Sequence, residues 1–320
     1  MTSTSRSLLV AILAALISTS QAMAQNSPES RYCQTVHLAD DGWLTNSAIN
    51  AVAQEILTKL GYQTNVTHGL GSSILTTMAA TDDAQPRIDA YLNFWDGLSA
   101  PGVTVGSLPE KLFASATELS PYEIGFFVPR YLYQDNFRTL KDLKKFADVL
   151  NHNVLGLGRR EPMNVVLETV LDDPELDLPA LHVRRLNNAE RVGAMTRFTG
   201  QRTPFVTYGI RPSSLVHRFD LVPLRGQAAW FNPNGFDQHI RAILRLEFTE
   251  RCANAARLLT NLAFSAEQLG ALLAGLDDAQ LPDQLAAQLI ADNPDWLREM
   301  TKGVTRRNGD KVDLVIFHEK

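Results

Sequence analysis

Short apolar runs alternate with amphipathic segments in the first third of the chain. Residues 36–39 form an apolar run that predicts a strand, and the apolar residues of 49–60 recur at helical spacing until Gly61 ends the pattern. Residues 62–67 predict a second strand. This strand–helix–strand order predicts a parallel sheet covered by helices, which is an α/β fold.

The same alternation continues through the middle of the chain. It predicts helices over 72–80, 139–150 and 163–171. Further apolar runs predict strands at 88–94, 124–128, 154–158, 183–186 and 205–208. The α/β pattern therefore extends over about the first two thirds of the sequence.

Leucine and alanine become dense in the last third of the chain. Their spacing predicts helices over 236–262 and 266–293. A chain of 320 residues is long enough for two lobes, and no linker-like segment separates them. We therefore expect two α/β lobes between which the chain crosses over.

The N-terminus carries an apolar run that is too short to span a membrane. LLVAILAALI at 8–17 is followed by AMA at 22–24, a small-residue pattern typical of a cleavage site. We interpret residues 1–24 as a secretory signal peptide that is removed after Ala24. No later segment is apolar enough to span a bilayer, so we expect an exported, soluble protein of the periplasm.

Two cysteines, Cys33 and Cys252, remain after the predicted cleavage. In an oxidising compartment two cysteines usually pair, so export favours a disulfide between them. The alternative is two buried free thiols. A disulfide would place the start of the mature chain and its last third in one lobe.

Charge and motifs narrow the range of functions. The chain has 30 basic and 35 acidic residues, a net charge of −5, which argues against general nucleic-acid binding. The sequence has no G-x-S-x-G, no H-E-x-x-H, no Walker loop and no C-x-x-C, and its seven histidines lack metal-ligand spacing. We therefore expect neither an enzyme nor a protein with a cofactor.

Two tryptophans lie at the ends of predicted strands. Trp43 follows the first strand, and Trp95 follows the strand at 88–94. Ligands bind outside the carboxyl ends of strands in open α/β sheets, and two indole faces can hold a methylated cation. The alternative is that both rings pack between helices and sheet.

An ordered set of short motifs covers nearly all of residues 33–298. The motifs are C-x-T-V-x-L-A-D-x-GW at 33–43, LGYQTNVT at 60–67, IDAYLNFWDG at 88–97, IGFFVPRYLY at 124–133, LKDL at 140–143, YGIRPSSLVHRFDLVPL at 208–224 and the leucine-rich stretch at 261–297. Together they resemble the glycine betaine/choline substrate-binding proteins of ABC importers.

This resemblance implies a two-lobed periplasmic binding protein with two chain crossovers. Lobe one would comprise residues 30–118 and 226–320, and lobe two residues 119–225. The ligand would lie between the lobes, which close over it by a hinge motion. The resemblance also implies a monomer that delivers its ligand to an ABC permease in the inner membrane. The disulfide between Cys33 and Cys252 likewise resembles choline-binding members.

The resemblance places Trp43 and Trp95 in a box for a small quaternary ammonium compound such as choline, betaine or carnitine. The opposite wall departs from the family, with Ile124 where an aromatic residue is usual and Ile210 where a tryptophan is usual. A second family tryptophan falls near Ser214. The residues that could supply the missing aromatic surface are Tyr91, Tyr122 and Tyr208.

Charged residues near the predicted cleft open a second possibility. Arg159 and Arg160 lie where a helix is predicted to begin, which favours an anion, and Arg211 could clamp a carboxylate. Asp96 and Glu123 are candidate partners for a cation. The alternative ligand is thus a small carboxylate or an amino-acid-like zwitterion with an apolar body.

Two other functions are compatible with the same chain. A ligand-sensing module for a membrane receptor would have the same fold, because fold does not fix function. A secreted enzyme is disfavoured by the missing catalytic motifs.

Overall fold

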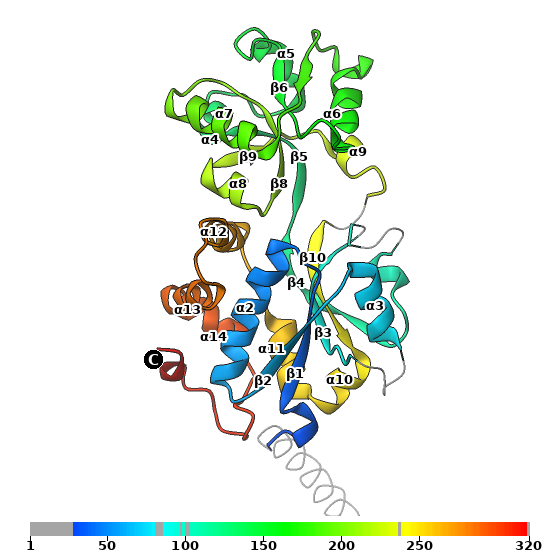
Figure 1. Ribbon diagram of the computed structural model, residues 1–320, viewed down its shortest axis with the longest axis vertical. Coiled ribbons are helices and arrows are strands. Elements are labelled where there is room, and N and C mark those ends of the chain that lie inside the picture. Colours follow the sequence, from blue (N-terminus) through cyan, green and yellow to red (C-terminus); the bar gives the residue numbers. More distant parts are fainter. Residues whose placement is uncertain (1–27, 81–85, 97, 100–102, 236–237, 319–320) are drawn as a thin grey trace, which may run out of the picture.

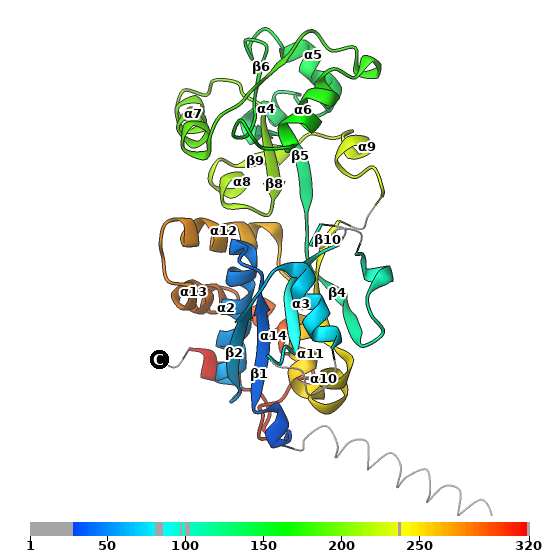
Figure 2. The same cartoon turned by 45° about the vertical axis from the view of Figure 1, so that its right-hand side comes forward.

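The computed structural model describes residues 28–80, 86–96, 98–99, 103–235 and 238–318. Two α/β lobes are stacked along the long axis of the molecule (Figure 1). Among the described residues, each lobe is built on a five-stranded mixed sheet. The turned view in Figure 2 shows how few segments join the two lobes.

The first sheet, which defines lobe one here, has the strand order β2–β1–β3–β10–β4. β1 (Thr35–Asp40) lies parallel to β2 (Gln63–His68) and β3 (Ala90–Trp95). β10 (His239–Arg245) runs antiparallel between β3 and β4 (Leu112–Pro121). Because β1 and β3 are parallel, their carboxyl ends meet at one edge of the sheet, and that edge faces the second lobe (Figure 1).

The second sheet, which defines lobe two, has the order β7–β6–β8–β5–β9. β6 (Asn153–Leu155) pairs in parallel with β7 (His182–Arg184) and β8 (Thr207–Arg211). β5 (Glu123–Pro129) runs antiparallel to β8 and to β9 (Leu221–Pro223). Both sheets are therefore mixed.

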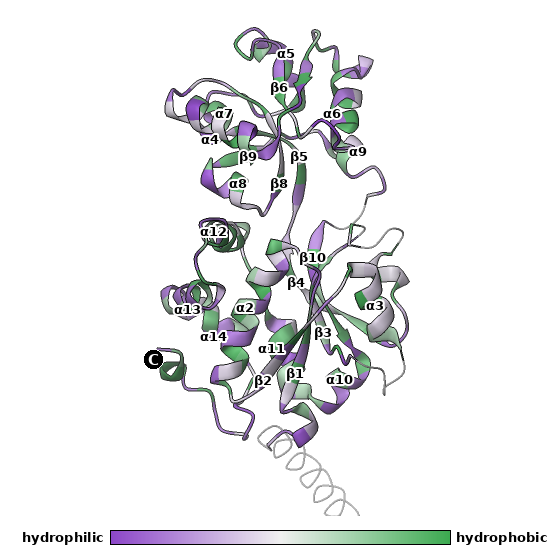
Figure 3. Cartoon of the chain, in the orientation of Figure 1, coloured by the Kyte–Doolittle hydropathy of each residue, from purple (hydrophilic) through white to green (hydrophobic). Residues whose placement is uncertain are grey.

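Helices cover both faces of each sheet and divide each lobe's core in two. In lobe one, α2 and α11 to α14 pack on one face and α3 on the other; in lobe two, α7 and α8 cover one face and α4 to α6 the other. Figure 3 shows apolar residues gathered along α11 beside the first sheet. The helices are α2 (Leu44–Lys59), α3 (Gly71–Ala79), α4 (Arg130–Gln134), α5 (Leu143–Phe146), α6 (Met163–Leu171), α7 (Asn188–Gly200), α8 (Ser214–Arg218), α9 (Ala228–Phe231), α10 (Leu246–Arg251), α11 (Ala253–Asn261), α12 (Ala266–Asp277), α13 (Pro282–Asp292) and α14 (Pro294–Met300).

The chain crosses from lobe one to lobe two between Pro121 and Glu123, and it returns through α9 to β10. The return segment is fixed to β5 by one side chain. The Gln227 amide oxygen accepts a hydrogen bond from the Phe126 N–H at 2.7 Å, and its nitrogen donates to the Phe126 carbonyl at 3.3 Å. Gly125, at φ +145°, permits this approach because a Cβ there would collide with the Gln227 amide.

Helices α8 and α12 bring the lobes into direct contact. Arg218 at the end of α8 forms an ion pair at 2.6 Å with Asp278, the residue after α12. Gly270 of α12 lies so close to His217 that an added Cβ would be 2.9 Å from the His217 Cβ. The glycine therefore lets the two helices pack closely on this side of the molecule.

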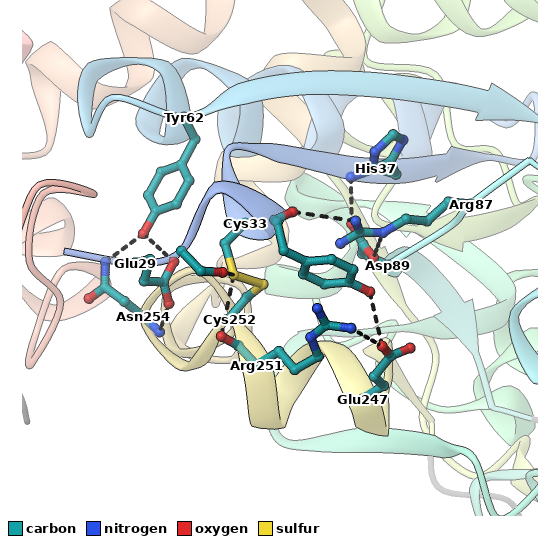
Figure 4. The surroundings of a disulfide bond; sticks show 12 residues. Glu29, Cys33, His37, Tyr62, Arg87, Asp89, Glu247, Arg251, Cys252 and Asn254 are labelled. Carbon is teal, nitrogen blue, oxygen red and sulfur yellow. Dashed lines mark hydrogen bonds and ion pairs between the residues drawn. A yellow bond between two sulfur atoms is a disulfide. The ribbon is translucent and has the colours of Figure 1, made fainter. Parts of the chain in front are cut away.

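A disulfide joins Cys33 to Cys252 at the end of lobe one that is remote from lobe two (Figure 4). The two Cα atoms are 5.5 Å apart, and the bond links residues separated by 219 positions. Beside it, the Tyr32 ring lies between the guanidinium groups of Arg87 at 3.8 Å and Arg251 at 3.5 Å. The predicted disulfide is confirmed, and it joins η1 (Arg31–Cys33) to the segment between α10 and α11 within lobe one.

Most of the predicted strands and helices are confirmed, but the helix predicted over 236–262 is wrong. β10 occupies His239–Arg245 as the strand between β3 and β4, and it is followed by α10 and α11. Its residues Ile240, Ala242, Ile243 and Leu244 are all buried. A strand buried on both faces shows no alternation, so its apolar run looks like part of a helix.

Two further differences concern one predicted helix and the strand β4. The helix predicted over 139–150 is reduced to a 3-10 turn at Leu140–Asp142 and α5, and a capping box between Thr139 and Asp142 begins the turn. β4 was not predicted, since much of its sequence, LFASATELSP, is small or polar. The predicted signal peptide at 1–24 lies outside the described residues.

Candidate ligand-binding site

Trp43 and Trp95 lie together at the edge of lobe one that faces lobe two. Trp43 immediately precedes α2, and Trp95 ends β3. The ring centroids are 5.8 Å apart and the planes are inclined by 54°. Trp43 is 50% exposed whereas Trp95 is 2% exposed, so the Trp43 indole offers a free face and the Trp95 indole supports it.

Asp41 organises the loop that carries Trp43. One carboxylate oxygen accepts a hydrogen bond from the Trp43 N–H at 2.9 Å, and the other accepts from the Tyr91 hydroxyl at 2.6 Å and the Asn93 amide at 2.9 Å. Asn93 in turn accepts from the Trp95 indole N–H at 2.8 Å. Both tryptophans are thus positioned by one polar network in which the half-buried Asp41 bonds to the buried Tyr91 and Asn93.

Two small cavities adjoin the tryptophan pair. One, of about 230 Å³, is lined by both rings and Leu273 from lobe one and by Ile210 and Pro212 from lobe two. The other, of about 180 Å³, lies within lobe one and is lined by both rings, Asp41 and the start of α3. A ligand placed against Trp43 can therefore contact both lobes.

Two of the three candidate tyrosines are buried behind the site and do not line its cavities. The Tyr122 ring lies 4.9 Å from Trp95, and its hydroxyl donates to the Asp96 carbonyl at 2.8 Å. Tyr91 donates to Asp41, and burial together with that carboxylate raises the pKa of Tyr91. These rings support Trp95 and the loop, so they cannot replace a missing wall.

Asp96 is also committed within the protein. It is buried, and one of its carboxylate oxygens accepts a hydrogen bond from the Val105 N–H at 3.0 Å. Its carboxylate holds the segment after β3, and none of the cavities beside the tryptophan pair is lined by it. The structure therefore gives Asp96 a structural contact in place of the expected cation contact.

Ile124 and Ile210 are directly opposite each other on β5 and β8. Ile210 lines the 230 Å³ cavity and faces the two tryptophans across it. Ile124 lines none of the cavities described here and packs against the cores of both lobes. The wall opposite the tryptophans is thus aliphatic, and Ile210 provides part of it.

The three candidate arginines line neither of the two cavities beside the tryptophan pair. Arg211 and Glu123 are cross-strand neighbours and form an ion pair with each other. Arg159 and Arg160 are exposed in the turn before α6 and line none of these cavities. The sequence could not show the first pairing, because it depends on the register of two strands far apart in the chain.

A family model described as the substrate-binding domain of ABC-type glycine betaine transport systems matches residues 34–292. The chain belongs to this family. A curated relative, the glycine betaine/carnitine transport binding protein GbuC of Listeria monocytogenes, is 23% identical over 171 residues, which cover 53% of this chain and 56% of that protein. The matched stretch therefore spans little more than half the length of that relative.

Solved structures of binding proteins share the two-lobed fold of this family member. A choline-binding protein of an ABC transporter, in complex with choline, has a TM-score of 0.58 at 23% identity and covers 91% of this chain and 99% of its own. A lactococcal protein complexed with glycine betaine in a closed form has a TM-score of 0.55 at 17% identity, covering 85% of this chain and 100% of its own. The predicted two-lobed periplasmic binding protein fold is confirmed.

This glycine betaine transport family consists of transport proteins that bind small molecules for an ABC transporter. Within the described part of the chain, no helix is long and apolar enough to cross a membrane. The same residues contain no cluster of three or more histidine, cysteine or acidic side chains suited to a metal ion.

One residue that borders the site in this family member was missed in the sequence. Arg191 is buried on α7 and lines a third cavity of about 850 Å³ with Tyr208 and Ile210. The spacing of α7 could have indicated this burial. Ala194 and Met195 follow Arg191 by three and four residues, and all three are buried on the same helix face. An arginine within an apolar stripe indicates a specific role, since arginine is seldom buried without a partner.

Proposed function

We propose that this protein is the solute-binding component of an ABC importer and captures a small quaternary ammonium or related zwitterionic compound. Choline, betaine and carnitine represent this class. The observation that carries the proposal is the exposed Trp43 face held against Trp95 by the Asp41 network. The electron-rich face of an indole attracts a cation and requires no hydrogen bond from it, which suits a trimethylammonium group.

The relatives support this ligand class. Similar proteins are named for glycine betaine, carnitine and choline. The aliphatic wall at Ile210 provides a surface that packs against methyl groups but lacks a negative ring face. We therefore expect weaker cation binding than a complete aromatic cage would give, by about 1–2 kcal/mol for each aromatic residue that is absent.

Capture would proceed by closure of the two lobes. Residues 30–118 with 226–320 would move as one body and residues 119–225 as the other. The 230 Å³ cavity is lined from both lobes, so closure would bury a ligand placed against Trp43. Affinity would come from desolvated contacts and a few fixed polar groups, with no covalent chemistry.

The protein would act as a monomer in the periplasm after removal of residues 1–24, and the closed form would be recognised by an inner-membrane permease. The apolar run at 8–17 and the AMA sequence at 22–24 support export. A sensing role would use the same closed form with a different membrane partner. Uptake of labelled ligand by cells with and without the gene separates transport from sensing.

A thermal-shift screen of the ligand-stripped protein tests the ligand class. The panel contains choline, betaine, carnitine, amino acids, and small mono- and dicarboxylates. A ligand that binds the folded state alone raises the melting temperature. A rise with quaternary amines supports the proposal, whereas a rise with carboxylates alone indicates that the aliphatic wall and the buried arginine have changed the specificity.

A further inference from the structure

A cavity lined mostly by residues of lobe two lies beside the tryptophan site. It measures about 850 Å³ and is bounded by β8, α7, α8 and the start of α6. Much of its lining is apolar, including Met163, Met195 and Ile210. Its volume exceeds what a trimethylammonium group fills, so it can accept the remainder of a longer ligand.

Arg191 is the buried charged residue in this lining. It is 8% exposed and donates one hydrogen bond, from Nη1 to the Tyr208 carbonyl at 3.2 Å. Its Nε has no hydrogen-bond partner among the described residues, and no carboxylate there forms an ion pair with it. A buried guanidinium without a counter-charge is unfavourable unless an anion joins it.

The helix positions around Arg191 add to the preference for an anion. The cavity is lined by Met163 at the first turn of α6 and by Asn188 at the first turn of α7. Both turns present the positive end of a helix dipole. Glu190, the acidic neighbour of Arg191, is turned back to the Asn187 N–H at 2.9 Å and so leaves the guanidinium unneutralised.

Other charged groups lie at the rim of the cavity. Glu161 and Asp277 line it but are exposed to solvent. Arg218 lines it and is already paired with Asp278. The buried part of the cavity therefore has one uncompensated charge, and that charge is positive.

Tyr208 offers a second donor beside Arg191. Tyr208 is one of the residues that line the cavity, and its hydroxyl forms no hydrogen bond with another described residue. Burial raises the pKa of Tyr208 to about 12, although the Arg191 charge opposes the rise, so the hydroxyl is protonated at neutral pH and can donate.

This cavity adjoins the tryptophan cavity, because Ile210, Ser213 and Ser214 line both. A ligand can therefore extend past Ile210 from Trp43 into lobe two. We propose that Arg191, assisted by the Tyr208 hydroxyl, is an anion subsite that binds the carboxylate of a zwitterionic ligand whose cationic head lies on Trp43. This inference rests on the proposed function and names its ligand more closely: a quaternary amine that carries a carboxylate on an apolar chain.

Two probes that differ only in the carboxylate measure its contribution to the binding affinity. Trimethylammonio-butanoate and its methyl ester share the same head and chain and differ in one charge. Calorimetry on the full mature protein should show that wild type binds the acid about tenfold or more tightly than the ester, since a hydrogen-bonded charge pair contributes that much. Arg191→Met should remove this preference and leave ester binding within about twofold, because binding of the head does not depend on the guanidinium.

Three variants control for folding and for charge. Arg197→Met removes an exposed arginine from the same helix and should keep the preference for the acid. Arg191→Lys keeps the charge and should keep part of the preference. Trp43→Ala should weaken acid and ester alike, which separates loss of the cation site from loss of the anion site.

One result would contradict the anion subsite alone, and another would contradict the proposed function. If wild type binds acid and ester equally and Arg191→Met changes neither, the anion subsite is wrong while the quaternary ammonium site stands. If neither probe binds wild type, the proposed function is wrong, and butanoate and small dicarboxylates are then compared on wild type and Arg191→Met. A melting shift with a carboxylate that disappears in Arg191→Met supports the subsite, and the absence of any shift contradicts it.

Discussion

The side-chain amide of Gln227 forms two hydrogen bonds with the backbone of Phe126, one to its N–H and one to its carbonyl. The return crossover is thereby fixed to the first strand of lobe two. Gln227 is buried. Without its amide the Phe126 N–H would lose this partner, whereas the Phe126 carbonyl would still accept from the Leu224 N–H at 2.9 Å.

Gln227→Ala should therefore lower the free energy of unfolding by about 1–3 kcal/mol, the cost of leaving the buried Phe126 N–H without this partner. Urea denaturation followed by circular dichroism measures the change. Gln201→Ala, at an exposed glutamine after α7, is the matched control and should be nearly neutral. Equal stability of the two variants would show that the Gln227 contacts do not hold the crossover.

The two tryptophans of the site should respond differently to truncation. Trp43→Ala should weaken binding of a quaternary amine by about tenfold or more and change the free energy of unfolding by less than about 1 kcal/mol, because half of its surface is already exposed. Trp95→Ala should cost about 3–5 kcal/mol of stability, as expected for a buried aromatic residue. Calorimetry and urea denaturation measure both quantities. A large loss of stability in Trp43→Ala with unchanged affinity would place Trp43 in the core and refute the site.

Removal of the disulfide should affect stability and leave ligand binding intact. The double variant Cys33→Ala, Cys252→Ala should lose about 2–5 kcal/mol of unfolding free energy. Its affinity should match wild type, because the bond lies at the far end of lobe one from the tryptophan site (Figure 1). Denaturation with and without a reductant provides the control: the reductant should destabilise wild type and leave the variant unchanged.

The Asp142 carboxylate should make lobe two sensitive to acid. Burial disfavours its charge, but hydrogen bonds from Lys145, the Thr139 hydroxyl and N–H and the Arg138 N–H outweigh this and hold the pKa of Asp142 at about 2. Since the folded pKa lies below the ordinary value of 3.8, the contribution is present above pH about 4 and is lost as pH falls toward 2.

Wild type should accordingly be more stable than Asp142→Asn at neutral pH, and the difference should shrink between about pH 4 and pH 2. Urea midpoints measured across this range give the comparison. Asp135→Asn, at an exposed carboxylate of the same lobe, controls for the loss of one charge. A difference that stays constant down to pH 2 would exclude this linkage.

Much of the fold was predictable because β1, α2 and β2 follow one another directly in the sequence. The periodicity of 36–67 predicts β1, α2 and β2, and their parallel pairing follows from their order. β4 was missed because much of its sequence is small or polar, and β10 because a strand buried on both faces shows no alternation. Their residues are read correctly only once the strand order β3–β10–β4 is known.

The part of the site in lobe one could be predicted from the sequence. Trp43 lies in the loop after β1, and Trp95 ends β3, the parallel neighbour of β1, so their proximity follows from sequence. The other side depends on how β5 and β8 align, and that alignment pairs Arg211 with Glu123. Arg191 belongs to no motif, and its burial becomes evident only when α7 is packed on the second sheet.

The bond between Cys33 and Cys252 also closes residues 33–252 into a covalent ring. All of lobe two lies within this ring, and the bond itself lies in lobe one. A protease that cuts one exposed loop anywhere between these two residues opens the ring but releases neither fragment. Such a nicked molecule would migrate as one species until it is reduced, and its sheets would stay assembled. The bridge therefore preserves the pairing of the two lobes after a single break in the backbone that joins them.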